Sequence, residues 1–179
     1  MVTIQAIGLR WVKGEADDPA DQCAHGEMSL SAGDVEFVTV GDGELTLSGA
    51  AFYLLRTLES SHTPTDPVAE ANLLLPCCAF NAWPAGENES LILMGCGGGV
   101  DMTVEHLPIA RVRLMRGDRA AVVTLEDWRS AVVGFARQIE VFYGSASPKD
   151  QIDDEFEQRG WQLFWAEWRD LMRKHAPAA

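Results

Sequence analysis

The chain has 179 residues, 27 of them acidic and 14 basic, and it carries a formal net charge of −13 at pH 7. This charge excludes nucleic acids and anionic membrane surfaces as main partners, because both attract proteins largely through Lys and Arg. Hydrophobic residues make up 47% of the chain, which excludes wholesale disorder, and apolar runs such as 91–94 fall far short of the roughly 20 residues of a membrane-spanning helix.

The length and the cysteine content bound the domain organisation and the compartment. We expect residues 1–179 to form a single domain, because this length lies within the usual range for one domain. The segment 1–11 lacks a basic stretch followed by an apolar one and a cleavage site, which favours a cytoplasmic protein. Four cysteines, two of them adjacent, then indicate reduced thiols rather than a disulfide framework.

The first half of the chain predicts strands and one helix. Residues 3–12 alternate apolar and polar side chains as a strand does. Residues 27–40 alternate in two pieces that are separated by turn residues at 31–34, which predicts an N-terminal hairpin. Ser48 can cap a helix near 48–59, where apolar residues recur at helical spacing.

The second half has the clearer patterns. Alternation with short turns over about 91–124 predicts an antiparallel meander of four strands, with no room for the crossover helices of a parallel sheet. Helical spacing predicts helices near 125–143 and 150–175, the last with a tryptophan stripe that we assign to the core. The expected fold class is therefore α+β, a largely antiparallel sheet covered by helices, with the C-terminal helix 150–175 packing on the single domain.

Cysteine and histidine residues offer one candidate metal site. Thiolate and imidazole are preferred zinc ligands, and the chain contains Cys23-Ala-His25 and the adjacent pair Cys77-Cys78, with Cys96 further on. The spacing lacks the two paired units of a usual structural zinc site, so buried, unligated thiols remain an alternative. A small zinc-binding module or enzyme that uses Cys23, His25, Cys77 and Cys78 is our second functional hypothesis.

Other chemical patterns are weaker. Ser61-His62 with Asp66 lacks the glycine-flanked serine of a hydrolase nucleophile turn. The segment 91–99, LILMGCGGG, resembles the first motif of S-adenosylmethionine-dependent methyltransferases, in which a strand ends in a glycine loop that opens a helix. That resemblance implies a methyltransferase as a remote alternative, although the residues after Gly99 alternate as a strand. We predict no catalytic residue and no cofactor, and we expect a protein that is not an enzyme.

The charge is distributed unevenly along the chain. Residues 1–90 hold 14 acids and 3 bases, whereas residues 91–179 hold 13 acids and 11 bases. A strongly negative surface speeds association with basic partners, although solubility alone would also account for it. The candidate partner-binding residues are the acids that cluster near the N-terminus: Asp17, Asp18, Asp21, Asp34, Glu36, Asp42 and Glu44.

In size, charge and expected architecture, the chain resembles the immunity proteins of bacterial polymorphic toxin systems. This resemblance rests on no motif and assigns no residues. It implies a non-enzymatic inhibitor whose carboxylates pair with the Arg and Lys of a basic protein partner, with a toxin as one candidate. We therefore expect an acidic binding protein that occludes a basic protein partner and that binds neither nucleic acid nor membrane.

Overall fold

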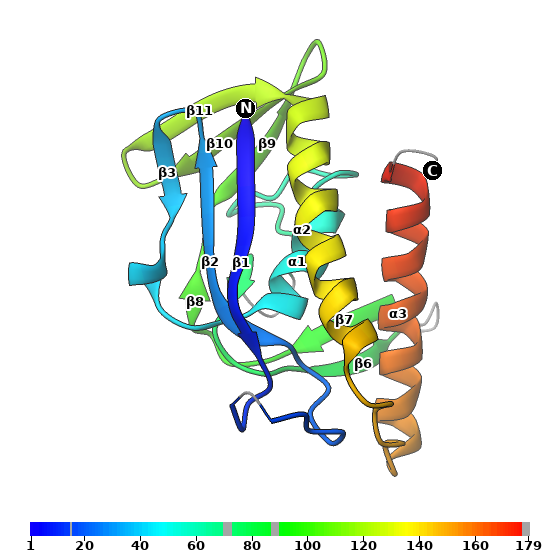
Figure 1. The fold of residues 1–179 in the computed structure, drawn as a ribbon. Coiled ribbons are helices and arrows are strands. Elements are labelled where there is room, and N and C mark those ends of the chain that lie inside the picture. The colour runs from blue at the N-terminus through cyan, green and yellow to red at the C-terminus, as the bar shows by residue number, and fades with distance from the viewer. Residues whose placement is uncertain (15, 70–72, 87–89, 177–179) are drawn as a thin grey trace.

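The computed structural model describes residues 1–14, 16–69, 73–86 and 90–176. Its antiparallel strand ladders and the helices packed on them confirm the α+β class (Figure 1). In chain order, the described elements are β1 (Val2–Arg10), β2 (His25–Ala32), β3 (Val35–Val38), the short 3-10 helix η1 (Val40–Asp42), β4 (Leu45–Thr46), α1 (Leu47–Arg56), β5 (Leu75–Pro76), β6 (Asn81–Ala85), β7 (Ser90–Met94), β8 (Gly99–Val100), β9 (Thr103–Leu107), β10 (Arg111–Arg116), β11 (Arg119–Thr124), α2 (Leu125–Ser145) and α3 (Glu155–His175).

The N-terminal strands form the sheet β1-β2-β3, and β4 pairs with the first two residues of β2, His25 and Gly26. Strands β1 and β2 pair antiparallel from Val2–Ala32 to Ile7–Glu27, and the register shifts before Arg10 meets His25. The expected hairpin is present as β2 and β3, joined at Gly33 with a positive φ of 59°. The alternation of apolar and polar residues predicted these strands correctly because one face of the sheet packs on the core while the other faces solvent.

The meander contains three strands rather than four. Strands β9, β10 and β11 pair in sequence, but β7 pairs with β6 in a separate hairpin, and the short β8 pairs with β5. The reason lies at Gly99, which has a φ of 134° and packs so closely on the Leu75 carbonyl that a Cβ would overlap it. The glycine run after β7 therefore leads to a backbone pairing with a distant segment, and not to a hairpin turn.

The three helices lie close to the predicted ranges. Helix α2 begins after Thr124, whose hydroxyl accepts a hydrogen bond from the Asp127 N–H, as in a standard N-cap. Helix α3 begins at Glu155 and not near 150, with Asp154 as its N-cap. None of the described helices combines the length and apolar character needed to cross a membrane.

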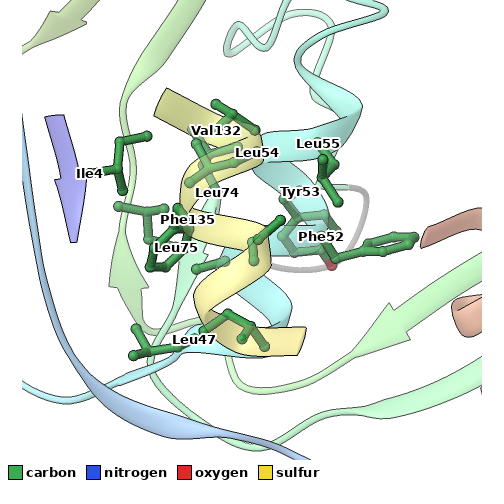
Figure 2. Close-up of a cluster of buried hydrophobic side chains, with 14 of the residues drawn as sticks. Ile4, Leu47, Phe52, Tyr53, Leu54, Leu55, Leu74, Leu75, Val132 and Phe135 are labelled. Atoms are coloured by element: carbon green, nitrogen blue, oxygen red, sulfur yellow. The ribbon is translucent and has the colours of Figure 1, made fainter. Parts of the chain in front are cut away.

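The hydrophobic core surrounds α1, whose residues from Leu47 to Leu55 are all buried. Helix α2 packs between α1 and β1, and α3 runs antiparallel to α2 and rests on the β6–β7 hairpin (Figure 1). Figure 2 shows side chains of β1, α1 and α2 meeting in this core, among them Ile4, Phe52 and Phe135. On α3, Trp161 and Trp168 are buried, so the predicted core role of the tryptophan stripe is confirmed for both.

Candidate functional site

Three cysteine side chains meet at one surface point. Cys77 and Cys78 directly follow β5, and Cys96 lies between β7 and β8. The Sγ–Sγ distances are 3.3 Å from Cys77 to Cys78, 3.2 Å from Cys77 to Cys96 and 2.8 Å from Cys78 to Cys96. Cys78 and Cys96 are exposed, and all three are free cysteines. We call Cys77, Cys78 and Cys96 the thiol cluster.

The pairing of β5 with β8 assembles the thiol cluster. The Cys77 N–H donates to the Gly98 carbonyl at 3.2 Å, which extends the β5–β8 ladder by one further bond. The Gly98 N–H donates to the Cys96 sulfur at 3.3 Å. A Cβ at Gly98 would lie 2.9 Å from the Cys77 sulfur, so a residue without a side chain lets the backbone approach both sulfurs.

The contacts within the thiol cluster shift the pKa values of Cys78 and Cys96 in opposite directions. The pKa of Cys96 is lowered by its hydrogen bonds with Cys78, with Cys77 and with the Gly98 backbone. The pKa of Cys78 is raised by its hydrogen bonds with Cys96 and Cys77. This is the expected effect of hydrogen bonds that favour one charged sulfur over its neighbours. Deprotonation is therefore easier at the exposed Cys96 than at Cys78.

The structure separates the predicted metal ligands. Among the described residues, the three sulfurs of the thiol cluster form the group of possible ligand atoms that lies within 4.8 Å, and neither Cys23 nor His25 belongs to it. The Cys23 thiol instead faces the Phe80 carbonyl at 3.6 Å. His25 is 3% exposed, its Nε2 lies 3.7 Å from Asp21 Oδ2, and burial lowers its pKa.

Cys23 gives a direct test of this separation. Cys23 is 2% exposed and burial raises its pKa to about 12, so we expect it to resist alkylation by iodoacetamide in the folded protein at pH 8, whereas the exposed Cys96, whose pKa is lowered, reacts. Peptide mass mapping after a short exposure should show unmodified Cys23 in native protein and full modification in guanidinium. Rapid labelling of Cys23 in native protein would contradict its buried position.

The seven predicted acidic residues lie in three segments. Asp17, Asp18 and Asp21 lie in the loop after β1, Asp34 and Glu36 lie at the β2–β3 hairpin, and Asp42 and Glu44 lie at the end of η1 and just after it. Glu44 pairs with Arg10 at the end of β1, next to the first of these segments. Asp34 in the hairpin turn and the loop after β1 lie beyond opposite ends of the β1–β2 ladder, which is about 25 Å long at 3.3 Å per residue. They therefore do not meet in one patch.

Most of the seven carboxylates also hold parts of the fold together. Asp42 makes a two-pronged ion pair with Arg116, at 2.6 and 2.9 Å, which lowers the pKa of Asp42. Glu44 pairs with Arg10, and Asp18 pairs with Lys13 at 2.8 Å. Asp21 accepts from the N–H groups of Val12 and Cys23, and Asp17 accepts from the Ser147 N–H. Asp34 and Glu36 are exposed.

The loop after β1 docks on the connection between α2 and α3. Lys149 donates to the Asp18 carbonyl at 2.9 Å while its ammonium lies 3.0 Å from the centre of the Trp11 ring. The Asp150 N–H donates to the Pro19 carbonyl at 2.9 Å. We call the described residues of the two joined segments, 12–24 and 146–158, the acidic end, because they include eight acids and only two bases.

A groove of about 340 Å³ lies beside the acidic end. Trp161 and Trp165 of α3 line it, together with Ile152 and Asp150 of the connection. Trp165 is only partly buried, so the groove offers accessible aromatic surface next to carboxylates. Tryptophan in such a setting is a common anchor of protein interfaces. The sequence does not indicate this groove, because the groove forms only when the connection 146–154 lies alongside α3.

Two other predicted patterns serve the fold. His62 donates from Nε2 to Asp101 at 3.0 Å and accepts the Val68 N–H at Nδ1, so this buried imidazole holds loops together and does not face Ser61 as a base. The glycine run after β7 leads into β8, a strand, and not into a helix. The local geometry therefore differs from the methyltransferase motif that the sequence resembles.

Comparison with protein-family models, curated proteins and solved structures finds no match to this chain. Its function is therefore argued from its own geometry.

Proposed function

We propose that this chain is a non-enzymatic acidic binding protein that occludes a basic protein partner through its acidic end. The observation that carries the proposal is the convergence of acids from both halves of the chain beside a groove with accessible tryptophan surface. Negative charge steers a basic partner to this end, and an apolar side chain seated in the groove would hold it.

This proposal shifts the binding surface relative to the one expected from the sequence. Asp17, Asp18 and Asp21 lie within it, but all three are bonded within the chain and the side chains of Asp18 and Asp21 are only 12% and 7% exposed. The exposed Asp150 and Asp153 therefore supply most of its accessible charge. Asp42 and Glu44 are engaged in ion pairs within the chain, so they are less available to a partner. Asp34 and Glu36 form a second acidic site at the other end of the β1–β2 ladder, which provides a matched comparison.

An inhibitor of the immunity-protein type fits this arrangement, because steric occlusion requires complementary charge and shape but no reacting group. We also propose that the protein acts in the cytoplasm, a reducing compartment in which its four free cysteines remain thiols. A toxin with a basic active-site surface is the partner class that we favour.

Charge reversal tests the proposal. The partner would be captured from a lysate of the native host at low salt, identified by mass spectrometry, purified and measured for association kinetics. We expect Asp150→Lys with Asp153→Lys to lower the association rate about tenfold and to flatten its salt dependence, because steering depends on the local field.

The matched control is Asp34→Lys with Glu36→Lys, a pair that alters the net charge equally at the distant acidic site. We expect this pair to change the association rate only slightly, because the two sites are farther apart than a Debye length of about 8 Å. Equal slowing by both pairs would show that net charge alone matters, and unchanged kinetics in the Asp150/Asp153 variant would refute the proposal.

A further inference from the structure

We propose that the thiol cluster is a binding site for a thiophilic metal cation, Zn²⁺ or Cu⁺, with Cys77, Cys78 and Cys96 as its three protein ligands. This site differs from the one expected from the sequence, because it includes Cys96 and excludes Cys23 and His25. It is also independent of the acidic end, so either proposal can fail alone.

The three cysteine sulfurs form a ligand set that suits a thiophilic cation. Three sulfurs from two segments 18 residues apart converge within 3.3 Å of one another, and soft thiolates select Zn²⁺ and Cu⁺ over hard cations. In a tetrahedral zinc site, with Zn–S bonds of about 2.3 Å, neighbouring sulfurs are about 3.8 Å apart. The sulfurs therefore need to separate by no more than about 1 Å to admit the ion.

The surroundings of the three sulfurs also favour a bound cation. The Gly98 N–H already donates to the Cys96 sulfur, and a backbone donor of this kind stabilises and orients a ligating thiolate. Cys78 and Cys96 are exposed, which gives the ion a path of entry and leaves a coordination position open to water or another ligand. The chain's net charge of −13 raises the local concentration of cations.

Binding replaces protons by the metal. Each ligating thiol loses its proton to solvent as its sulfur forms a bond to the cation, and no electrons are transferred. The alternative fate of neighbouring thiols is oxidation to a disulfide, which needs an oxidant and would join Cys78 to Cys96 or Cys77. The test is therefore designed to distinguish metal binding from disulfide formation.

The experiment uses the full chain, reduced and stripped of metal under anaerobic conditions. Zn²⁺ and, separately, Cu⁺ are added in competition with a chromophoric chelator. We expect one equivalent of one of these ions to be retained. Substituting Co²⁺ should give a near-ultraviolet sulfur-to-metal charge-transfer band, whose intensity reports the number of sulfur ligands.

Single substitutions then locate the site. Cys77→Ser, Cys78→Ser and Cys96→Ser each remove a direct ligand. Loss of a group that only supports a ligand typically lowers metal affinity by about 10- to 100-fold, so we expect each of these variants to lower it by more than that. Cys23→Ser should leave the affinity and the cobalt band unchanged, because Cys23 lies outside the cluster. Circular dichroism of each variant checks that a loss of binding does not reflect a loss of folding.

A glycine pair gives a test that retains all three ligands. A methyl group at Gly98 would crowd the Cys77 sulfur, whereas nothing lies within 4 Å of a Cβ at Gly97. Gly98→Ala should therefore weaken metal binding at least tenfold, and Gly97→Ala should not. The proposal is overturned if neither ion is retained, if Cys23→Ser weakens binding as much as Cys96→Ser, or if the cluster forms a stable disulfide in a cytosol-like glutathione buffer.

Discussion

Replacing Gly160 with Ala should lower the free energy of unfolding by about 3 kcal/mol, the upper end of the usual cost of overpacking. Gly160 is the point at which α3 rests on β6, and a Cβ there would overlap the Ala82 carbonyl and lie 2.7 Å from the Trp83 nitrogen. Both obstacles are backbone atoms, which cannot rotate away as a side chain can. The helix would have to move off the hairpin.

Urea unfolding followed by circular dichroism measures this effect. The matched control is Gly134→Ala in α2, where nothing lies within 4 Å of the added Cβ and the residue is exposed. There the better helix propensity of Ala should stabilise the protein by about 0.5–1 kcal/mol. A Gly160→Ala variant as stable as the native chain would mean that α3 does not pack on β6 at this distance.

Replacing Phe164 with Ala should lower the free energy of unfolding by about 3–5 kcal/mol, because it opens a cavity at the centre of an aromatic cluster. The Phe164 ring is fully buried and stacks on Phe52 of α1 with ring centres 4.7 Å apart. It also contacts Phe80, and its edge-on neighbours on α3 are Trp161 and Trp165. The ring therefore links α3 to α1 and to the segment before β6.

Two variants serve as controls in the same denaturation assay. Phe164→Leu retains most of the volume and should cost less than about 1.5 kcal/mol. Phe156→Ala removes a ring of the same helix that is 53% exposed, and it should change stability by less than about 1 kcal/mol. Equal losses for Phe156→Ala and Phe164→Ala would contradict the placement of α3 on the core.

Local patterns predicted the elements better than their partners. The helix near 125–143 was predicted closely because its apolar period and its Thr124 cap lie within the element itself. The start of α3 was placed five residues too early, since the Asp150 N–H is bonded to the Pro19 carbonyl, far away in the chain, and Asp154 caps the helix. The spacing of hydrophobic residues within a segment carries no information about such long-range contacts.

The same limit applies to the candidate sites. The sequence identifies cysteines as possible ligands, but only the β5–β8 pairing shows that Cys96, and neither Cys23 nor His25, joins Cys77 and Cys78. The signal that could have shown this pairing is the pair Gly98 and Gly99, because only residues without a side chain permit the close backbone contact that brings the two segments together. Likewise, a charge count finds the acids but not that Asp42 is paired with Arg116.

The docking of the loop after β1 on the α2–α3 connection has a consequence for synthesis of the chain. Segments 12–24 and 146–158 are about 120 residues apart along the chain, so a ribosome-bound chain carries the first of them well before the second is made. The acidic end is completed only when residues 146–158 have emerged. Any recognition that depends on this end is therefore lost in a chain that stops before residue 146.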